Sequence, residues 1–106
     1  MEKLDREEAL ERIQGTSLKG HLYGVTYNDL VNLFGEPTFP EPSGDDKVQV
    51  EWVIEHDEEV FTIYDWKTYS RRETTEELTE WNVGAKVYAG DFITMVEIKL
   101  TEINKA

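Results

Sequence analysis

The chain contains no cysteine, which excludes both a disulfide framework and a thiolate metal site. It has only two histidines, His21 and His56, and neither has a partner at metal-ligand spacing. The acidic residues show no calcium-loop spacing, and no Gly-rich phosphate loop or nucleophile elbow occurs. The sequence therefore predicts no metal, no cofactor and no catalytic residue, and it favours a protein that is not an enzyme.

Long apolar runs are also missing. The charged start, Met1–Glu8, has no apolar stretch behind it and so resembles neither a signal peptide nor a transit peptide. No segment approaches the length of a membrane span. The lack of cysteine suits a reducing compartment. We therefore expect a cytoplasmic protein that has no membrane partner.

What the chain has in abundance is negative charge. Its 106 residues fit a single domain, 1–106, and the 39% hydrophobic and 11% aromatic content argues against disorder. Eleven Lys and Arg stand against 23 Asp and Glu, which gives a formal net charge of −12. Such a chain is repelled by nucleic acid and attracted to basic protein surfaces. The partner that we expect is a basic surface of a protein or nucleoprotein complex, with no direct contact to nucleic acid.

Helices are predicted at both ends of the chain. Good helix formers over residues 3–14 predict a helix with a thin apolar stripe, loosely placed on the surface. Residues 16–24 predict a loop or a short strand. Residues 88–104 fit either a helix or an alternating strand, and their length favours a helix over 91–104 capped by Asp91.

A third helix has both of its ends marked. Thr26 is a typical N-cap, and Asp29 stands three residues later, where a capping acid belongs. Gly35 provides a stop in the left-handed αL conformation, and Pro37 blocks continuation. These signals predict a helix over residues 27–34.

Three extended segments alternate with turns. Residues 47–55 alternate between an apolar face and a mostly polar face, and residues 60–66 are rich in aromatic and β-branched side chains. The residues between them predict a hairpin turn, 73–78 predicts a turn of helix, and 81–87 predicts a third strand. The expected fold is α+β, a three-stranded antiparallel meander with helices packed on one face.

The middle of the chain concentrates the acids. Between Glu36 and Glu59 there are nine acidic residues and one basic residue, Lys47. Alternate residues on a strand face lie about 6.6–6.8 Å apart, comparable with successive phosphates on a nucleic-acid strand. The alternative is an ordinary charged face that discourages edge pairing. The candidate partner-binding residues are Glu51, Glu55, Asp57, Glu58 and Glu59, with Glu73, Glu76 and Glu77 as a second patch.

The aromatic residues suggest a different surface. Core packing accounts best for Trp52, Phe61 and Trp81. Trp66 and Tyr69 stand beside a polar loop, where such residues can anchor a protein interface. With the nearby cations they form an alternative partner-binding set, Trp66, Tyr69, Arg71 and Arg72.

A set of short segments between residues 25 and 84 carries a resemblance. The segments are Val25-Thr26-Tyr27-Asn28-Asp29-Leu30-Val31, Phe34-Gly35-Glu36-Pro37, Lys47-Val48, Glu51-Trp52, Phe61-Thr62-Ile63-Tyr64-Asp65-Trp66-Lys67 and Glu80-Trp81-Asn82-Val83-Gly84. They resemble small proteins of unknown function carried by bacteriophages and other mobile elements. The resemblance implies that the protein acts in a host cytoplasm, where small acidic phage proteins often occupy the basic surfaces of defence nucleases or DNA-binding complexes.

The leading hypothesis is therefore a non-catalytic, phage-type inhibitor of a host nucleic-acid-handling or defence complex, acting through a DNA-mimic-like acidic surface. The alternative is a structural or assembly module that uses the aromatic and basic patch. An enzyme acting on a cationic substrate is a third class that the motifs do not support.

Overall fold

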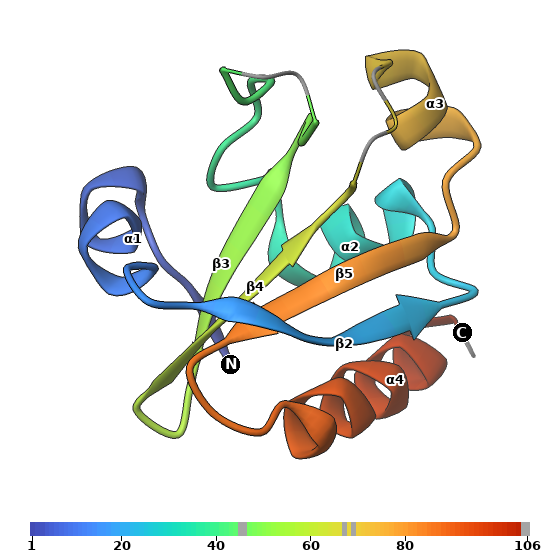
Figure 1. The fold of residues 1–106 in the computed structure, drawn as a ribbon. Coiled ribbons are helices and arrows are strands. Elements are labelled where there is room, and N and C mark those ends of the chain that lie inside the picture. The colour runs from blue at the N-terminus through green and yellow to red at the C-terminus, as the bar shows by residue number, and fades with distance from the viewer. Residues whose placement is uncertain (45–46, 67, 69, 105–106) are drawn as a thin grey trace.

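A computed structural model describes residues 1–44, 47–66, 68 and 70–104. The chain forms an antiparallel sheet with α2 and α4 on one face and α1 on the other, while α3 lies beyond one end of the sheet (Figure 1). In chain order the elements are β1 (Glu2–Lys3), α1 (Arg6–Arg12), β2 (Ser17–Tyr23), α2 (Tyr27–Phe34), β3 (Glu51–His56), β4 (Glu59–Tyr64), α3 (Arg71–Glu76), β5 (Glu80–Ala85) and α4 (Gly90–Asn104).

The predicted α+β class is confirmed, but the sheet has five strands rather than three. Its order is β1-β3-β4-β5-β2, and the expected meander is the central part, β3-β4-β5. Six of the seven residues of β2 pair with β5, and the register shifts between Leu18 and Gly20, so that Lys19 has no partner there. A bulge of this kind interrupts the two-residue alternation by which a strand is recognised in sequence.

The N-terminal helix is shorter and more firmly placed than predicted. Instead of spanning 3–14, it begins after Asp5, whose side chain accepts a hydrogen bond from the backbone N–H of Glu8 at 3.0 Å. The preceding residues form β1, which pairs with β3. Ala9 is fully buried and packs in one cluster with Val53 and Val60 of the sheet. The prediction of a loosely placed helix, and of helices on one face only, is therefore wrong.

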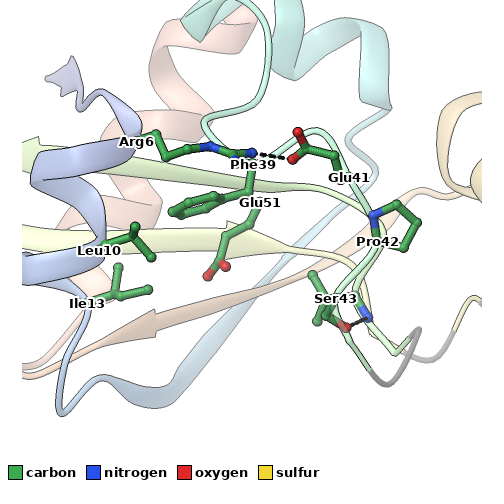
Figure 2. A pocket seen from close by; sticks show the side chains of 9 residues that line it. Arg6, Leu10, Ile13, Phe39, Glu41, Pro42, Ser43 and Glu51 are labelled. Carbon is green, nitrogen blue, oxygen red and sulfur yellow. Dashed lines mark hydrogen bonds and ion pairs between the residues drawn. The ribbon is translucent and has the colours of Figure 1, made fainter.

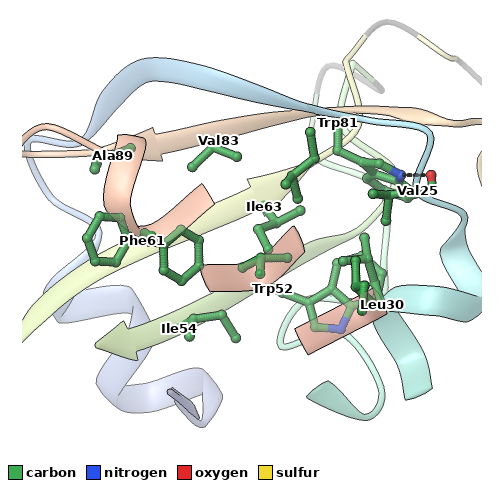
Figure 3. Packing of buried hydrophobic residues seen from close by; sticks show 14 of the residues in the cluster. Val25, Leu30, Trp52, Ile54, Phe61, Ile63, Trp81, Val83 and Ala89 are labelled. Atoms are coloured by element: carbon green, nitrogen blue, oxygen red, sulfur yellow. Dashed lines mark hydrogen bonds between the residues drawn. The ribbon is translucent and has the colours of Figure 1, made fainter. Parts of the chain in front are cut away.

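The opposite face of the sheet carries the main core, which α2 and α4 cover (Figure 3). Trp52 and Trp81 are fully buried and meet edge to face, with ring centroids 5.6 Å apart. Phe61 stacks on Phe92 of α4 at 4.2 Å. The Trp81 indole N–H donates to the backbone carbonyl of Val25 at 2.8 Å, so its one polar atom is satisfied. The three aromatic residues predicted for the core are confirmed.

The helix over 27–34 has the predicted bounds. The Thr26 hydroxyl accepts from the backbone N–H of Asp29 and the Asp29 carboxylate accepts from that of Thr26, each at 3.0 Å, which completes a capping box. Gly35 ends the helix at φ 85° and ψ −164°. This positive φ suits glycine, but the ψ angle places the residue outside the predicted αL region, in a conformation open essentially to glycine alone.

The remaining elements shift by a few residues. β3 spans 51–56 rather than 47–55, since Gln49 and Val50 donate their backbone N–H groups to the side chain of Asp65 and not to a strand. β4 and β5 begin one residue before their predicted starts and end two residues before their predicted ends. The C-terminal segment is a helix, as its length indicated, but Asp91 lies in the first turn and is not the cap.

Candidate functional site

The tip of the β3–β4 hairpin presents two acids in an unusual backbone conformation. His56 pairs with Glu59, which leaves Asp57 and Glu58 as a two-residue turn. Their φ angles are 51° and 69°, and both side chains are exposed. Two-residue turns with positive φ at both positions favour Asn-Gly or Asp-Gly, so Asp57 suits the first position, whereas Glu58 meets steric resistance at the second. The fold therefore keeps a glutamate at a position where glycine would be more favourable.

Arg12 connects this hairpin to α1. Its Nη1 lies 2.6 Å from a carboxylate oxygen of Glu55, and its Nη2 donates to the backbone carbonyl of Glu58 at 3.1 Å. Glu8, one turn earlier on α1, lies 3.7 Å from the same guanidinium. The hydrogen bond to Glu55, followed by the nearby charges of Glu55, Glu8 and Glu59, raises the pKa of Arg12. One cation thus stands among several carboxylates. We call this surface the acidic end: Glu8, Glu55, Asp57, Glu58 and Glu59.

Glu51 is on the same strand face as Glu55 but does not belong to the acidic end. Its carboxylate points into a cavity (Figure 2), and burial raises its pKa to about 7. Between the two acids, Val53 is fully buried beneath α1. The prediction that β3 is buried on one face only is therefore wrong, because Val53 is buried on the second face as well. The buried valine separates Glu51 from Glu55, so their carboxylates do not form one exposed row.

The second predicted acidic patch lies far from the first. Glu73 and Glu76 are on α3, Glu77 is its C-cap, and all three are exposed. Figure 1 shows α3 and the β3–β4 hairpin at opposite ends of the molecule. Glu76 pairs with Arg72 at 2.8 Å. The two acidic patches therefore do not form one continuous surface.

The alternative aromatic and basic surface is brought together only in part. Trp66 is 49% exposed, and Lys47 places its ammonium 5.9 Å from the centre of the indole ring. Tyr69 lies outside the residues that the structure describes. Arg71 donates to the carbonyl of Pro40 at 2.6 Å, and Arg72 is held by Glu76. Both guanidinium groups thus have partners within the chain.

The cavity that contains Glu51 lies between α1, residues 39–43, Val48 and the start of β3 (Figure 2). Its volume is about 630 Å³, and most of its wall is apolar. The lining residues are Arg6, Leu10, Ile13, Phe39, Glu41, Pro42, Ser43, Val48 and Glu51. Sequence analysis missed this site because it placed the N-terminal helix loosely on the surface. The buried valine between Glu51 and Glu55 is the sequence feature that could have indicated a covering element.

The polar surroundings of Glu51 come from β4. Burial is the main cause of its raised pKa, a hydrogen bond with Thr62 opposes the rise, and the charge of Asp65 adds to it. Tyr64 is the cross-strand partner of Glu51. Burial likewise raises the pKa of Tyr64, while a hydrogen bond with Asn82 opposes the rise. Glu51 is therefore a carboxyl group that is only partly ionised at neutral pH.

Asp65 is a fully buried acid with a structural role. Its carboxylate accepts the backbone N–H groups of Gln49 and Val50, at 2.8 and 3.0 Å. It also accepts from the hydroxyls of Thr68 and Thr74. These bonds connect the segment before β3 with the segment between β4 and α3. No oxygen of Asp65 is left to face a ligand, since both accept hydrogen bonds from the chain.

The residues that the structure describes contain no group of three or more His, Asp or Glu side chains placed to hold a metal ion. Within the same residues, no helix is long and apolar enough to cross a membrane. Comparison of the chain with protein-family models, with curated proteins and with solved structures finds no match.

Proposed function

We propose that the protein is a non-catalytic binding protein that docks its acidic end on a basic surface of a partner protein or nucleoprotein complex. The observation that carries this proposal is the hairpin tip. Glu58 occupies a positive-φ position that favours glycine, next to Asp57, whose own positive φ suits an aspartate. Backbone strain of this kind is commonly retained where side chains serve a function. Here the side chains are two exposed carboxylates.

The charges around the tip support an electrostatic role. Arg12 balances only one of the five carboxylates of the acidic end, and the whole chain carries −12. Aligned charges of one sign accelerate association with an oppositely charged surface and select against partners of the same sign. A basic groove that normally receives nucleic acid has the matching charge.

The resemblance to small phage-borne proteins supports a host nucleic-acid-handling or defence complex as the partner, with inhibition as the result of docking. In this form, mimicry of nucleic acid depends on the acidic end alone. Glu51 lies outside the acidic end, because its carboxylate lies in the cavity beside α1.

The test begins with a partner isolated from a bacterial lysate on the immobilised protein. Its affinity is then measured against salt concentration for a triple variant, Asp57→Asn, Glu58→Gln and Glu59→Gln. We expect the affinity at low salt to fall about tenfold and the salt dependence to become shallower. The matched control removes three charges from α3 and its C-cap, with Glu73→Gln, Glu76→Gln and Glu77→Gln, and should bind like the parent protein.

Three results would contradict the proposal. A larger loss in the control would assign binding to the α3 patch, and equal losses would show that only net charge matters. Full binding by both variants would favour the second candidate function, an assembly module that uses the Trp66 surface. That candidate is supported by the 49% exposure of Trp66 beside a hollow lined by His21 and Tyr64. Trp66→Ala would then abolish binding.

A further inference from the structure

The cavity between α1 and residues 39–43 combines a mostly apolar wall with the buried carboxylate of Glu51. Leu10, Ile13, Phe39 and Val48 line it, and the carboxylate of Glu51 points into the space between them (Figure 2). We propose that this cavity receives a lysine side chain of the basic partner, with its ammonium group on Glu51 and its methylene chain against the apolar wall. This inference rests on the proposed function, because it assigns a second contact to the same docking event.

The chemistry of lysine matches both parts of the cavity. Its side chain has a flexible apolar stem and a compact ammonium head, and lysines commonly bury the stem while the head finds a polar partner. An arginine fits less well. Its planar fork pairs best with two free oxygens of one carboxylate, whereas the Glu51 carboxylate already shares a hydrogen bond with Thr62.

The basic residue that the chain itself places at this cavity, Arg6, pairs with an acid other than Glu51. Arg6 lies at the cavity, but its guanidinium is turned to Glu41 in an ion pair and lies over the ring of Phe39, 5.4 Å from its centre (Figure 2). Among the ion pairs between described residues, none involves Glu51. The carboxylate inside the cavity is thus available for a cation that arrives from outside.

The raised pKa of Glu51 is consistent with the binding of an ammonium group in the cavity. Burial raises its pKa to about 7, so the surroundings of Glu51 disfavour the ionised form. An ammonium group placed against the carboxylate would reverse this effect by favouring ionisation. Binding is therefore coupled to the release of a proton at neutral pH.

The position of the cavity fits a partner docked on the acidic end. The helix α1 contributes Leu10, and its C-cap Ile13, to the cavity. On the same helix, Glu8 belongs to the acidic end and Arg12 contacts it. Leu10 is 51% exposed at the rim. A partner that covers the acidic end can therefore continue across α1 to the cavity mouth.

The probe is lysine blocked at its backbone, Nα-acetyl-lysine-N-methylamide, so that only the side-chain ammonium is free. It is titrated into the protein and followed by NMR. We expect saturable shifts at Leu10, Ile13 and Phe39, and none from the uncharged norleucine analogue. Glu51→Gln keeps the side-chain shape, so it should weaken probe binding about tenfold. Glu102→Gln removes an equal charge from the exposed side of α4, away from the cavity, and should have no effect. Equal binding by Glu51→Gln and the parent, or shifts confined to other residues, would overturn the proposal.

A pH series on the parent protein gives a second measurement that needs no variant. The charged or titratable groups facing Glu51 are Arg6 of α1, Glu41, Tyr64 of β4 and Asp65 after it. Probe affinity should rise about tenfold from pH 6 to pH 8 as Glu51 ionises. A probe affinity that stays constant over this pH range would overturn the proposal. The same rise in the Glu51→Gln variant would also overturn it, because the rise would then come from groups other than Glu51.

Binding of the isolated partner separates this inference from the proposed function. If both are right, Glu51→Gln weakens partner binding at pH 8, and so does the hairpin triple variant. If only the hairpin variant weakens binding, the docking of the acidic end stands and the lysine contact is wrong. A cavity that binds n-butylamine while Glu51→Gln leaves partner affinity unchanged would be a site for a free amine, which also overturns the proposal.

Discussion

The guanidinium of Arg12 on α1 lies 2.6 Å from the carboxylate of Glu55 on β3, a pairing between residues 43 positions apart in the chain. This contact fixes α1 beside the hairpin and at the same time removes part of the negative charge from the acidic end. The same residue therefore acts on the fold and on the surface that we propose for binding, and the two effects can be separated by substitution.

The variant Arg12→Gln tests this double role. Without the guanidinium, Glu8 and Glu55 regain their full charge toward a partner, so affinity for a basic surface at low salt should rise roughly two- to fivefold. Arg72→Gln is the matched control, because it breaks the pair with Glu76 at the other end of the molecule. Affinities measured by calorimetry should rise for the first variant only. A decrease for Arg12→Gln would mean that the placement of α1 matters more than the charge.

The hairpin tip predicts opposite effects on stability and binding. Glu58→Gly relieves the steric cost of a positive φ and should increase the free energy of unfolding by about 1 kcal/mol. The control Glu58→Ala removes the same charge but keeps the steric cost of a positive φ, because alanine has a Cβ atom. Urea denaturation should separate the two variants, whereas partner binding should weaken equally in both. If glycine does not stabilise the protein relative to alanine, the tip carries no strain.

The buried carboxyl group of Glu51 makes stability depend on pH. Its pKa is about 7 in the folded protein and 4.5 in the ordinary state, so between these values the folded protein binds more protons than the unfolded chain. Its contribution to stability therefore falls as pH rises from 4.5 to 7. Glu51→Gln should be more stable than the parent by about 1–3 kcal/mol at pH 8 and little changed at pH 4. The midpoints of urea denaturation of the parent and the variant, measured at pH 4 and pH 8, check this prediction. A difference in stability that is the same at both pH values would contradict it.

Local signals in the sequence were sufficient for some elements. Thr26, Asp29 and Gly35 mark both ends of α2, and alternation with aromatic and β-branched residues located the three central strands to within a few residues. These features depend on neighbours in the chain, so a single sequence contains them. The helix α4 was also predicted correctly. Its apolar residues fit either a helix or a strand, and the length of the segment favoured the helix.

The structural features that could not be predicted from the sequence depend on contacts between residues far apart in the chain. Nothing near Glu2 and Lys3 indicates that they pair with β3, and the bulge in β2 hides its alternation. The cavity exists only because Ala9 brings α1 onto Val53 and Val60. Glu51 was therefore assigned to an exposed face, although the buried position of its neighbour Val53 decides otherwise. The acidic end also required the contact made by Arg12, which no local pattern reveals.

The capping box of α2 gives a direct test of local stability. Thr26→Ala removes the hydroxyl that accepts the Asp29 N–H, so the free energy of unfolding should fall by about 0.5–2 kcal/mol. In the control, Thr101→Ala, the lost hydroxyl bonds only within an exposed turn of α4 and the change should stay within about 0.5 kcal/mol. Denaturant unfolding distinguishes the two, and equal values would mean that the cap adds nothing.

Replacement of Asp65 should be more costly. In Asp65→Asn one acceptor oxygen becomes an amide that cannot accept hydrogen bonds from the backbone N–H groups and threonine hydroxyls around it. We expect a loss of about 2–4 kcal/mol, measured by urea denaturation. Asp57→Asn, at the exposed tip, is the control and should change stability by less than about 0.5 kcal/mol. A mild effect at Asp65 would show that the amide finds other partners.

The pairing of β2 with β5 has a consequence for how fast the chain folds. The strands β3, β4 and β5 are successive in the chain, so they can assemble from contacts between near neighbours. Partners such as Leu22 and Trp81 come from opposite ends of the chain, and a long loop must close before they meet. Contacts of this range slow folding, because the entropy of closure is lost before the pairing repays it. The central meander with α4 is therefore the expected folding nucleus, and β2 is the last strand to add.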